Sequence, residues 1–258
     1  MGLGHTFLMA AAAVSLHELA HILAAKSFGC KVRQLRISAL GEMAFIPQMK
    51  NLSLWKRTMI IAAGPACNLI NWLVFRQAGP DWNYQEYLEL FAFYNLILCG
   101  FNMLPIFPLD GAKLLQLLAG NRMGVARTNR LALRMGKICC GLLIALGVVQ
   151  AIMFAPNFTM LLVGFILWRK SKDIQVELMG EFYMAMMNKT NRLAEGPLPS
   201  RLVCAYSHQS LQQIVDSFGW DWLMLICLAD KNNIIVSESK IMEHVLCRGT
   251  NGTLADCL

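Results

Sequence analysis

The 258-residue sequence has few charged side chains: Asp, Glu, Lys and Arg make up 15% of it, whereas 56% is hydrophobic. Soluble globular domains carry about 25% charged residues. This shortage excludes an ordinary soluble protein and indicates a chain that lies largely in a lipid bilayer. The sequence also lacks a basic stretch ahead of its first apolar run, so we expect that run to stay in the protein rather than to be removed as a signal peptide.

The nine cysteines include no CxxC pair, and Cys139 and Cys140 are adjacent within an apolar run. A disulfide framework and a structural zinc ribbon both need regular cysteine spacing, which is missing here. We therefore expect most of the cysteines to act as small hydrophobic side chains.

Acidic residues are fewer than basic ones, 16 against 23, which gives a net charge of +7. The basic residues lie beside the apolar runs rather than along one amphipathic face, so they are typical of membrane topology signals and not of a nucleic-acid partner. Basic residues gather in 26–57, 122–137 and 169–172. Counted by the positive-inside rule, these segments predict an outside N-terminus and a cytoplasmic C-terminus.

Apolar runs predict a polytopic α-helical membrane protein, because a helix needs about 20 apolar residues to cross a bilayer. The five expected spans are residues 3–25, 58–75, 88–105, 138–155 and the shorter 157–168. Residues 30–47 alternate imperfectly around Gly41 and Glu42, which leaves two readings open: a membrane-associated β-hairpin or an ordinary connector. A hairpin would offer an open edge to an extended peptide.

The composition changes near residue 200. The pattern predicts strands at 201–206, 222–229 and 234–236 and helices at 209–218 and 237–247, a small βαββα unit. We therefore predict an embedded domain over 1–172, a linker over 173–198 and a cytoplasmic α+β domain over 199–258.

His17, Glu18 and His21 form an HExxH motif inside the first apolar run. On a helix, residues four apart share one face, so both imidazoles can reach one tetrahedral zinc ion. Glu18 is then placed to act on water without occupying a coordination position. The alternative is a set of polar groups satisfied between helices, but a carboxylate at membrane depth costs at least about 2.5 kcal/mol, which argues against a purely structural role.

A catalytic zinc site normally has three protein ligands and one open position, so a third ligand is needed. Asp110 is the strongest candidate, because it ends a segment in which Pro105 and Pro108 break the third expected span. The alternative is that Asp110 caps a helix over 112–118.

Together, the His17 to His21 motif, the Gly64-Pro65-Ala66-Cys67-Asn68 segment and residues 102–111 resemble the site-2 protease family of intramembrane zinc metalloproteases. Residues 93–96 and 102–114 are most similar to its sporulation branch. The resemblance covers about residues 10–170 and extends more weakly to the C-terminal unit, which looks like a single CBS-type module. The Gly64-Pro65 pair is expected to permit close helix packing near the site.

The resemblance implies that His17, His21 and Asp110 bind Zn²⁺, that Glu18 activates the water, and that Asn102 positions the substrate backbone or the developing oxyanion. It further implies proteolysis of a membrane-associated pro-protein, the sigma-factor precursor pro-sigma-K, under control of inhibitory membrane proteins. The membrane would be the bacterial cytoplasmic membrane or one surrounding the forespore.

Two alternatives stay open from the residues alone. The same His and Asp groups could serve a membrane metal transporter or metal-binding protein, and a catalytically silent relative could act as a scaffold. The resemblance implies that the CBS-like unit responds to ATP or engages substrate, although its own residues give no support for a nucleotide site. Self-association into a homo-oligomer is also left open.

Overall fold

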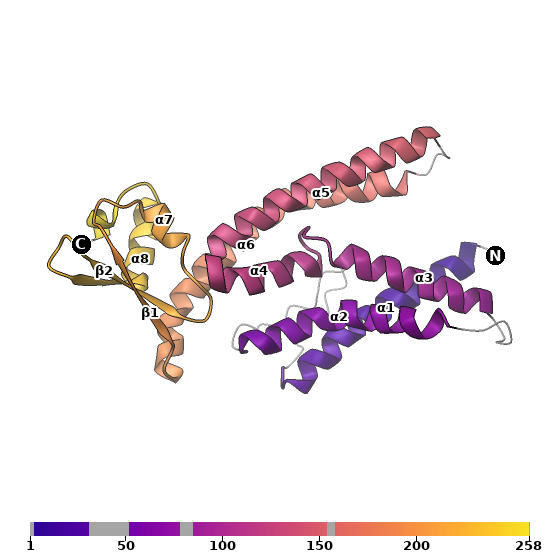
Figure 1. The fold of residues 1–258 in the computed structure, drawn as a ribbon, viewed down its shortest axis with the longest axis horizontal. Coiled ribbons are helices and arrows are strands. Elements are labelled where there is room, and N and C mark those ends of the chain that lie inside the picture. The colour runs from indigo at the N-terminus through magenta and orange to yellow at the C-terminus, as the bar shows by residue number, and fades with distance from the viewer. Residues whose placement is uncertain (1–2, 31–51, 78–84, 154–157, 258) are drawn as a thin grey trace. The chain divides into compact units, whose positions relative to one another are not determined.

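The structure, a computed structural model, describes residues 3–30, 52–77, 85–153 and 158–257 (Figure 1). The chain divides into two compact units, Met1–Leu114 and Leu115–Leu258, which are taken separately below. Nearly all of the segment for which a β-hairpin was considered, residues 30–47, lies outside the described residues.

Three helices form most of the first unit: α1 (Leu3–Ser27), α2 (Leu54–Phe75) and α3 (Gln85–Asn102). They lie side by side, with α2 packed against both others and α1 also in contact with α3 (Figure 1). Large apolar side chains point away from the bundle; Phe7 is 73% exposed and Val74 57%. Such extensive apolar exposure is favourable only against lipid or a partner.

The helix break predicted ahead of Asp110 is confirmed. Helix α3 ends at Asn102, and α4 (Asp110–Met123) begins with Asp110 itself. Within the connection, Ile106, Phe107 and Leu109 are buried. These apolar side chains anchor the connecting segment, so the start of α4 is held in place against the rest of the unit.

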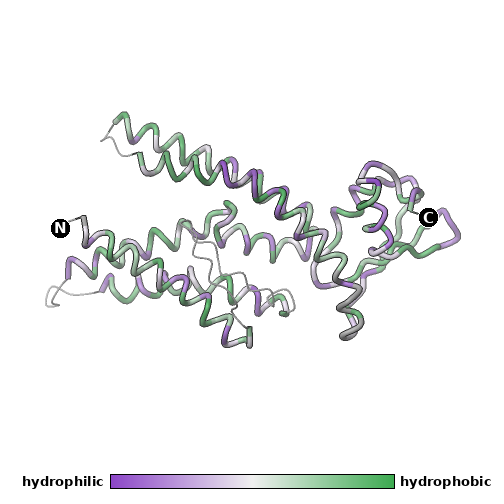
Figure 2. The backbone as a smooth tube through the Cα atoms, turned by 180° about the vertical axis from the view of Figure 1, so that it is seen from behind, coloured by the Kyte–Doolittle hydropathy of each residue, from purple (hydrophilic) through white to green (hydrophobic). Residues whose placement is uncertain are grey.

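In the second unit, α5 (Val125–Met153) and α6 (Thr159–Glu195) pack along each other as an antiparallel pair (Figure 1). Gly147 lies against Leu161, and Gly164 lies against Ile144, so small residues allow the two helices to approach closely. Figure 2 shows hydrophobic residues over the parts of this pair nearest Met153 and Thr159, with more polar residues along the rest.

Among the described residues, three helices are long and apolar enough to cross a membrane: Gly4–Ser27, Leu54–Phe75 and Val125–Met153. They correspond to the first, second and fourth expected spans. Most of the other two expected spans is helical, residues 88–102 in α3 and 159–168 in α6, but neither helix is among these three. A total of five spans therefore stays a prediction.

Most of the linker predicted over residues 173–198 is helical in the structure. Helix α6 continues without interruption to Glu195. Its second half places Phe182 and Met186, each 1% exposed, in the core of the second unit. Burying such a side chain stabilises the fold by about 1.5–3 kcal/mol, so this segment is part of a folded unit. Its mixed composition is that of a helix with one buried face.

The predicted order of strand, helix, strand, strand and helix is confirmed near the C-terminus. Strands β1 (Ser200–Ala205), β2 (Leu223–Leu228) and β3 (Ile234–Ser237) form one sheet in that order, parallel between β1 and β2 and antiparallel between β2 and β3. The helices are α7 (Leu211–Val215), shorter than predicted, and α8 (Glu238–Arg248), followed by a 3-10 turn over Leu254–Cys257.

The core of this unit follows from the alternation of side chains along the central strand. Met224, Ile226 and Leu228 are buried, whereas the intervening residues of β2 are partly exposed. The buried face packs with apolar residues of α6, α7 and α8. Ser237 caps α8 by accepting a hydrogen bond from the backbone N–H of Lys240.

A buried ion pair connects α6 to the sheet region. Lys189 Nζ lies 2.6 Å from Glu238 Oε1, and it also donates to the carbonyl oxygens of Gly219 at 2.6 Å and Trp222 at 3.1 Å. The second carboxylate oxygen of Glu238 accepts from the backbone N–H of Met224 at 2.9 Å. Both side chains are almost completely buried, so each charge depends on the other for compensation.

Replacing Lys189 with Met is expected to destabilise the second unit by about 3–5 kcal/mol, because Glu238 would keep a buried carboxyl without its cation. Hydrogen exchange of the β2 amides measures this loss. Adding Glu238→Gln to Lys189→Met should recover part of the stability. A loss below about 1 kcal/mol for the single variant, a value typical of surface ion pairs, would contradict the role assigned to this pair.

Candidate metal centre

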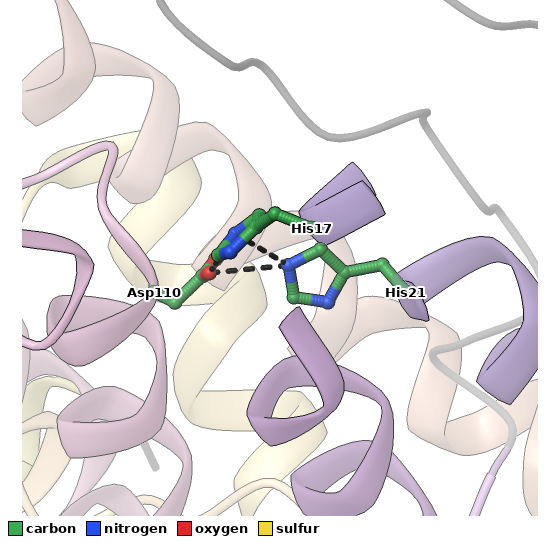
Figure 3. Close-up of side chains that lie close together, drawn as sticks. All are labelled: His17, His21 and Asp110. Carbon is green, nitrogen blue, oxygen red and sulfur yellow. Dashed lines mark hydrogen bonds and ion pairs between the residues drawn. The ribbon is translucent and has the colours of Figure 1, made fainter. Parts of the chain in front are cut away.

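The structure brings together the three side chains that the sequence predicted as ligands. His17 and His21 lie one turn apart on α1, and Asp110 is the first residue of α4 (Figure 3). The two Nε2 atoms are 3.1 Å apart, and each lies 3.1 Å from Asp110 Oδ2. All three residues are buried. The arrangement places two imidazole nitrogens and one carboxylate oxygen around a single point.

These distances fit one metal ion. Tetrahedral ligands bound at about 2.0–2.1 Å from zinc lie about 3.3 Å from one another, close to the 3.1 Å separations here. With their hydrogens on Nδ1, both imidazoles would direct an Nε2 lone pair toward Asp110 Oδ2, and a cation bound between the three atoms would offset the repulsion. Within the part of the chain that the structure describes, no other group of His, Cys, Asp and Glu is arranged in this way.

Helix α2 supplies the contacts behind both imidazoles. His21 Nδ1 lies 2.8 Å from the carbonyl oxygen of Ile60, to which it donates a hydrogen bond. The side-chain amide of Asn68 lies 2.9 Å from His17 Nδ1 and is fully buried. Sequence reasoning gave Asn68 no role at the site. The sequence did contain a signal that could have identified Asn68. This residue lies one turn after Gly64 and therefore on the same helix face.

Gly64 lies against both imidazole rings. A Cβ atom built at this position would be 2.3 Å from His21 Nε2 and 2.7 Å from His17 Cε1. The close helix packing expected at Gly64 is therefore present, and it occurs directly at the candidate ligands. The absence of a side chain here makes room for the rings.

Glu18 and Asn102 lie outside the three-residue cluster. Glu18 follows His17 on α1 and is partly buried. Asn102 is the last residue of α3, and its amide donates to the carbonyl oxygen of Leu98 at 3.1 Å. Its side chain is thus engaged with its own helix. The roles assigned to these two residues stay predictions.

A second polar contact joins α2 to α3. Asn71 Nδ2 donates to Asn95 Oδ1 at 3.2 Å, and Asn95 Nδ2 donates to the carbonyl oxygen of Phe91 at 2.8 Å. Asn95 is fully buried. Amide hydrogen bonds of this kind hold helices together in an apolar environment, so they help to fix the position of α2 behind the cluster.

An HExxH motif on a helix, beside a third potential ligand, is the pattern typical of zinc metallopeptidases, and here it lies in a bundle of apolar helices. The chain matches peptidase family M50 over residues 5–79 and 72–146, which together exceed half of its length. It belongs to this family, the site-2 proteases, and is an integral membrane protein. The resemblance recognised in the sequence is confirmed.

Individual relatives agree with the family. The chain is 34% identical to stage IV sporulation protein FB of Bacillus subtilis over 133 residues, 50% of this chain and 46% of that protein. It is 26% identical to a zinc metalloprotease of Methanocaldococcus jannaschii over 179 residues, 66% of this chain and 50% of that protein. The chain thus spans about half the length of these curated relatives.

Among solved structures, the chain is similar to the site-2 protease from Methanocaldococcus jannaschii, with a TM-score of 0.49 and 23% identity. The similarity covers 66% of this chain and 76% of that one.

Proposed function

We propose that this protein is an intramembrane zinc metalloprotease. The observation that carries the proposal is the buried cluster of His17, His21 and Asp110, whose three facing atoms have the spacing of ligands on one zinc ion. Membership of peptidase family M50 and similarity to a protein named as a zinc metalloprotease support the same chemistry.

In this proposal His17, His21 and Asp110 would hold the ion. Bound there, zinc would supply Lewis acidity, which would polarise a carbonyl group and lower the pKa of water. Glu18, adjacent to His17 on α1, takes the proton from the attacking water and delivers it to the leaving amine. Asn102 contributes an amide that positions the substrate backbone or stabilises the developing oxyanion.

The proposed substrate is a membrane-associated pro-protein, specifically the precursor of a sporulation sigma factor. Similarity to stage IV sporulation protein FB supports this assignment over half of the chain. Membrane regulatory proteins are the proposed partners. The proposed location of the CBS-like unit over 199–258 is the cytoplasm, which the distribution of basic segments supports. Cleavage would release the mature factor from the membrane.

Glu18→Gln is expected to reduce cleavage by about 10²- to 10⁴-fold, the contribution typical of general acid–base catalysis, because a neutral amide cannot accept the proton. Co-expression with a candidate pro-sigma factor and a gel shift of that substrate measure the effect. Glu86→Gln, the same change at an exposed position of α3, is the matched control. Zinc content should be the same in all three proteins.

Equal cleavage by wild type and Glu18→Gln would refute the proposed catalytic role. The same variant separates a protease from a metal transporter that uses the same ligands. Transport would survive the change because the three ligands remain, whereas peptide hydrolysis would be lost while zinc stays bound.

A further inference from the structure

We infer that Asn68 is a positioning residue that accepts a hydrogen bond from His17 Nδ1–H and thereby turns the lone pair of Nε2 toward the metal. This inference rests on the metal site of the proposed function. It assigns a role to a residue of α2 outside the cluster of His17, His21 and Asp110.

The first step concerns the two nitrogens of the His17 ring. Nε2 faces His21 and Asp110, so it is the atom available to a cation. A neutral imidazole that offers the lone pair of Nε2 carries its hydrogen on Nδ1. Nδ1 therefore carries a hydrogen and needs a hydrogen-bond acceptor, which has to lie on the side of the ring away from His21 and Asp110.

The second step concerns the amide of Asn68, which lies 2.9 Å from Nδ1 and is fully buried. An amide offers an oxygen acceptor at one end and a nitrogen donor at the other, and a half-turn about its last bond exchanges them. In the structure it is Nδ2 that lies 2.9 Å from His17 Nδ1, and Oδ1 is buried with no hydrogen-bond partner among the described residues. With Oδ1 toward the ring, it accepts from Nδ1–H, which is what metal binding through Nε2 requires.

The third step compares the two histidines. His21 has the same arrangement, because its Nδ1 donates to the carbonyl oxygen of Ile60 at 2.8 Å. Ile60, Gly64 and Asn68 are spaced four residues apart and so lie on one face of α2. This face of α2 supplies an acceptor for each imidazole, with Gly64 between them leaving room for the rings. One helix thus sets the orientation of both imidazoles.

Partners of this kind fix the orientation of a ligating imidazole and raise its basicity, and their loss typically weakens metal binding by about 10- to 100-fold. We expect Asn68→Leu, which is similar in size but has no acceptor, to raise the zinc dissociation constant by that factor. Asn68→Asp retains an oxygen at this position and is expected to keep an affinity within about tenfold of wild type or better.

The experiment uses the full-length protein purified in detergent. Competition with a chromophoric chelator measures the zinc dissociation constant, and the absorption spectrum of the Co²⁺-loaded protein reports the ligand geometry. Asn251→Leu is the matched control: it makes the same substitution at an exposed residue of the second unit. The control should bind zinc as wild type does and give the same cobalt spectrum.

Wild-type affinity and an unaltered cobalt spectrum in Asn68→Leu would overturn the inference and leave the proposed protease function intact. If Asn68→Leu fails to fold, as judged by circular dichroism and size exclusion, Asn68→Asp decides. A folded Asn68→Asp that loses more than tenfold in affinity contradicts the acceptor role. A wild-type protein that binds no zinc would instead refute the proposed metal site, and this inference with it.

Discussion

Gly64→Ala is expected to abolish zinc binding and proteolysis together. The added methyl carbon would lie 2.3 Å from His21 Nε2, 2.6 Å from His21 Cε1 and 2.7 Å from His17 Cε1, all well inside van der Waals contact. Alanine favours a helix over glycine by only about 1 kcal/mol, a gain too small to offset the displacement of both rings. The imidazoles must therefore move away from Asp110 or α2 must move away from α1.

Zinc content after purification and cleavage of the co-expressed substrate are the two measurements for Gly64→Ala. Gly100→Ala in α3 is the matched control, since a Cβ atom there would meet nothing within 4 Å. The control should keep both properties and gain slightly in helix stability. A Gly64→Ala protein with bound zinc and normal cleavage would show that the rings are not held where the structure places them.

Asp110→Asn is expected to weaken zinc binding by more than about 100-fold, beyond the loss typical for a residue that only supports a ligand, and to remove proteolysis. The substitution keeps the size of the side chain but replaces a charged ligand with a neutral amide. His17 and His21 would remain close together, with two protein ligands instead of the usual three. The two rings alone are insufficient for a stable catalytic site.

The zinc dissociation constant from chelator competition measures the effect of Asp110→Asn. Asp173→Asn, an equivalent change at an exposed position of α6, should leave both zinc binding and cleavage unchanged. If Asp110→Asn retained wild-type affinity, a different residue would have to be the third ligand. The cluster would then lose its interpretation as a three-ligand centre.

Much of the site could be predicted because its chemistry is local in sequence. The four-residue spacing of His17 and His21 puts them on one helix face whatever surrounds the helix. Asp110 was identified by a different argument, the need for a third ligand together with a proline-broken helix end. The structure then placed its carboxylate 3.1 Å from both rings.

Helix α6 shows where local pattern was insufficient. Its polar second half reads as a linker, because few of its residues form a long apolar run. It is helical because Phe182, Met186 and the paired Lys189 find partners in residues that come later in the chain. Those partners, on α8 and in the sheet, are known only once the chain has folded.

By itself the sequence determined the apolar helices, the two histidines, the candidate aspartate and the order of elements near the C-terminus, because each depends on composition or on spacing along one segment. Only the tertiary structure decided that Ile60, Gly64 and Asn68 support the imidazoles. Ile60 acts through its backbone oxygen and Gly64 through the absence of a side chain. Asn68 acts through an amide whose partner, His17, lies on another helix. Such roles depend on how α1 and α2 are rotated and how closely they approach, which no local pattern records.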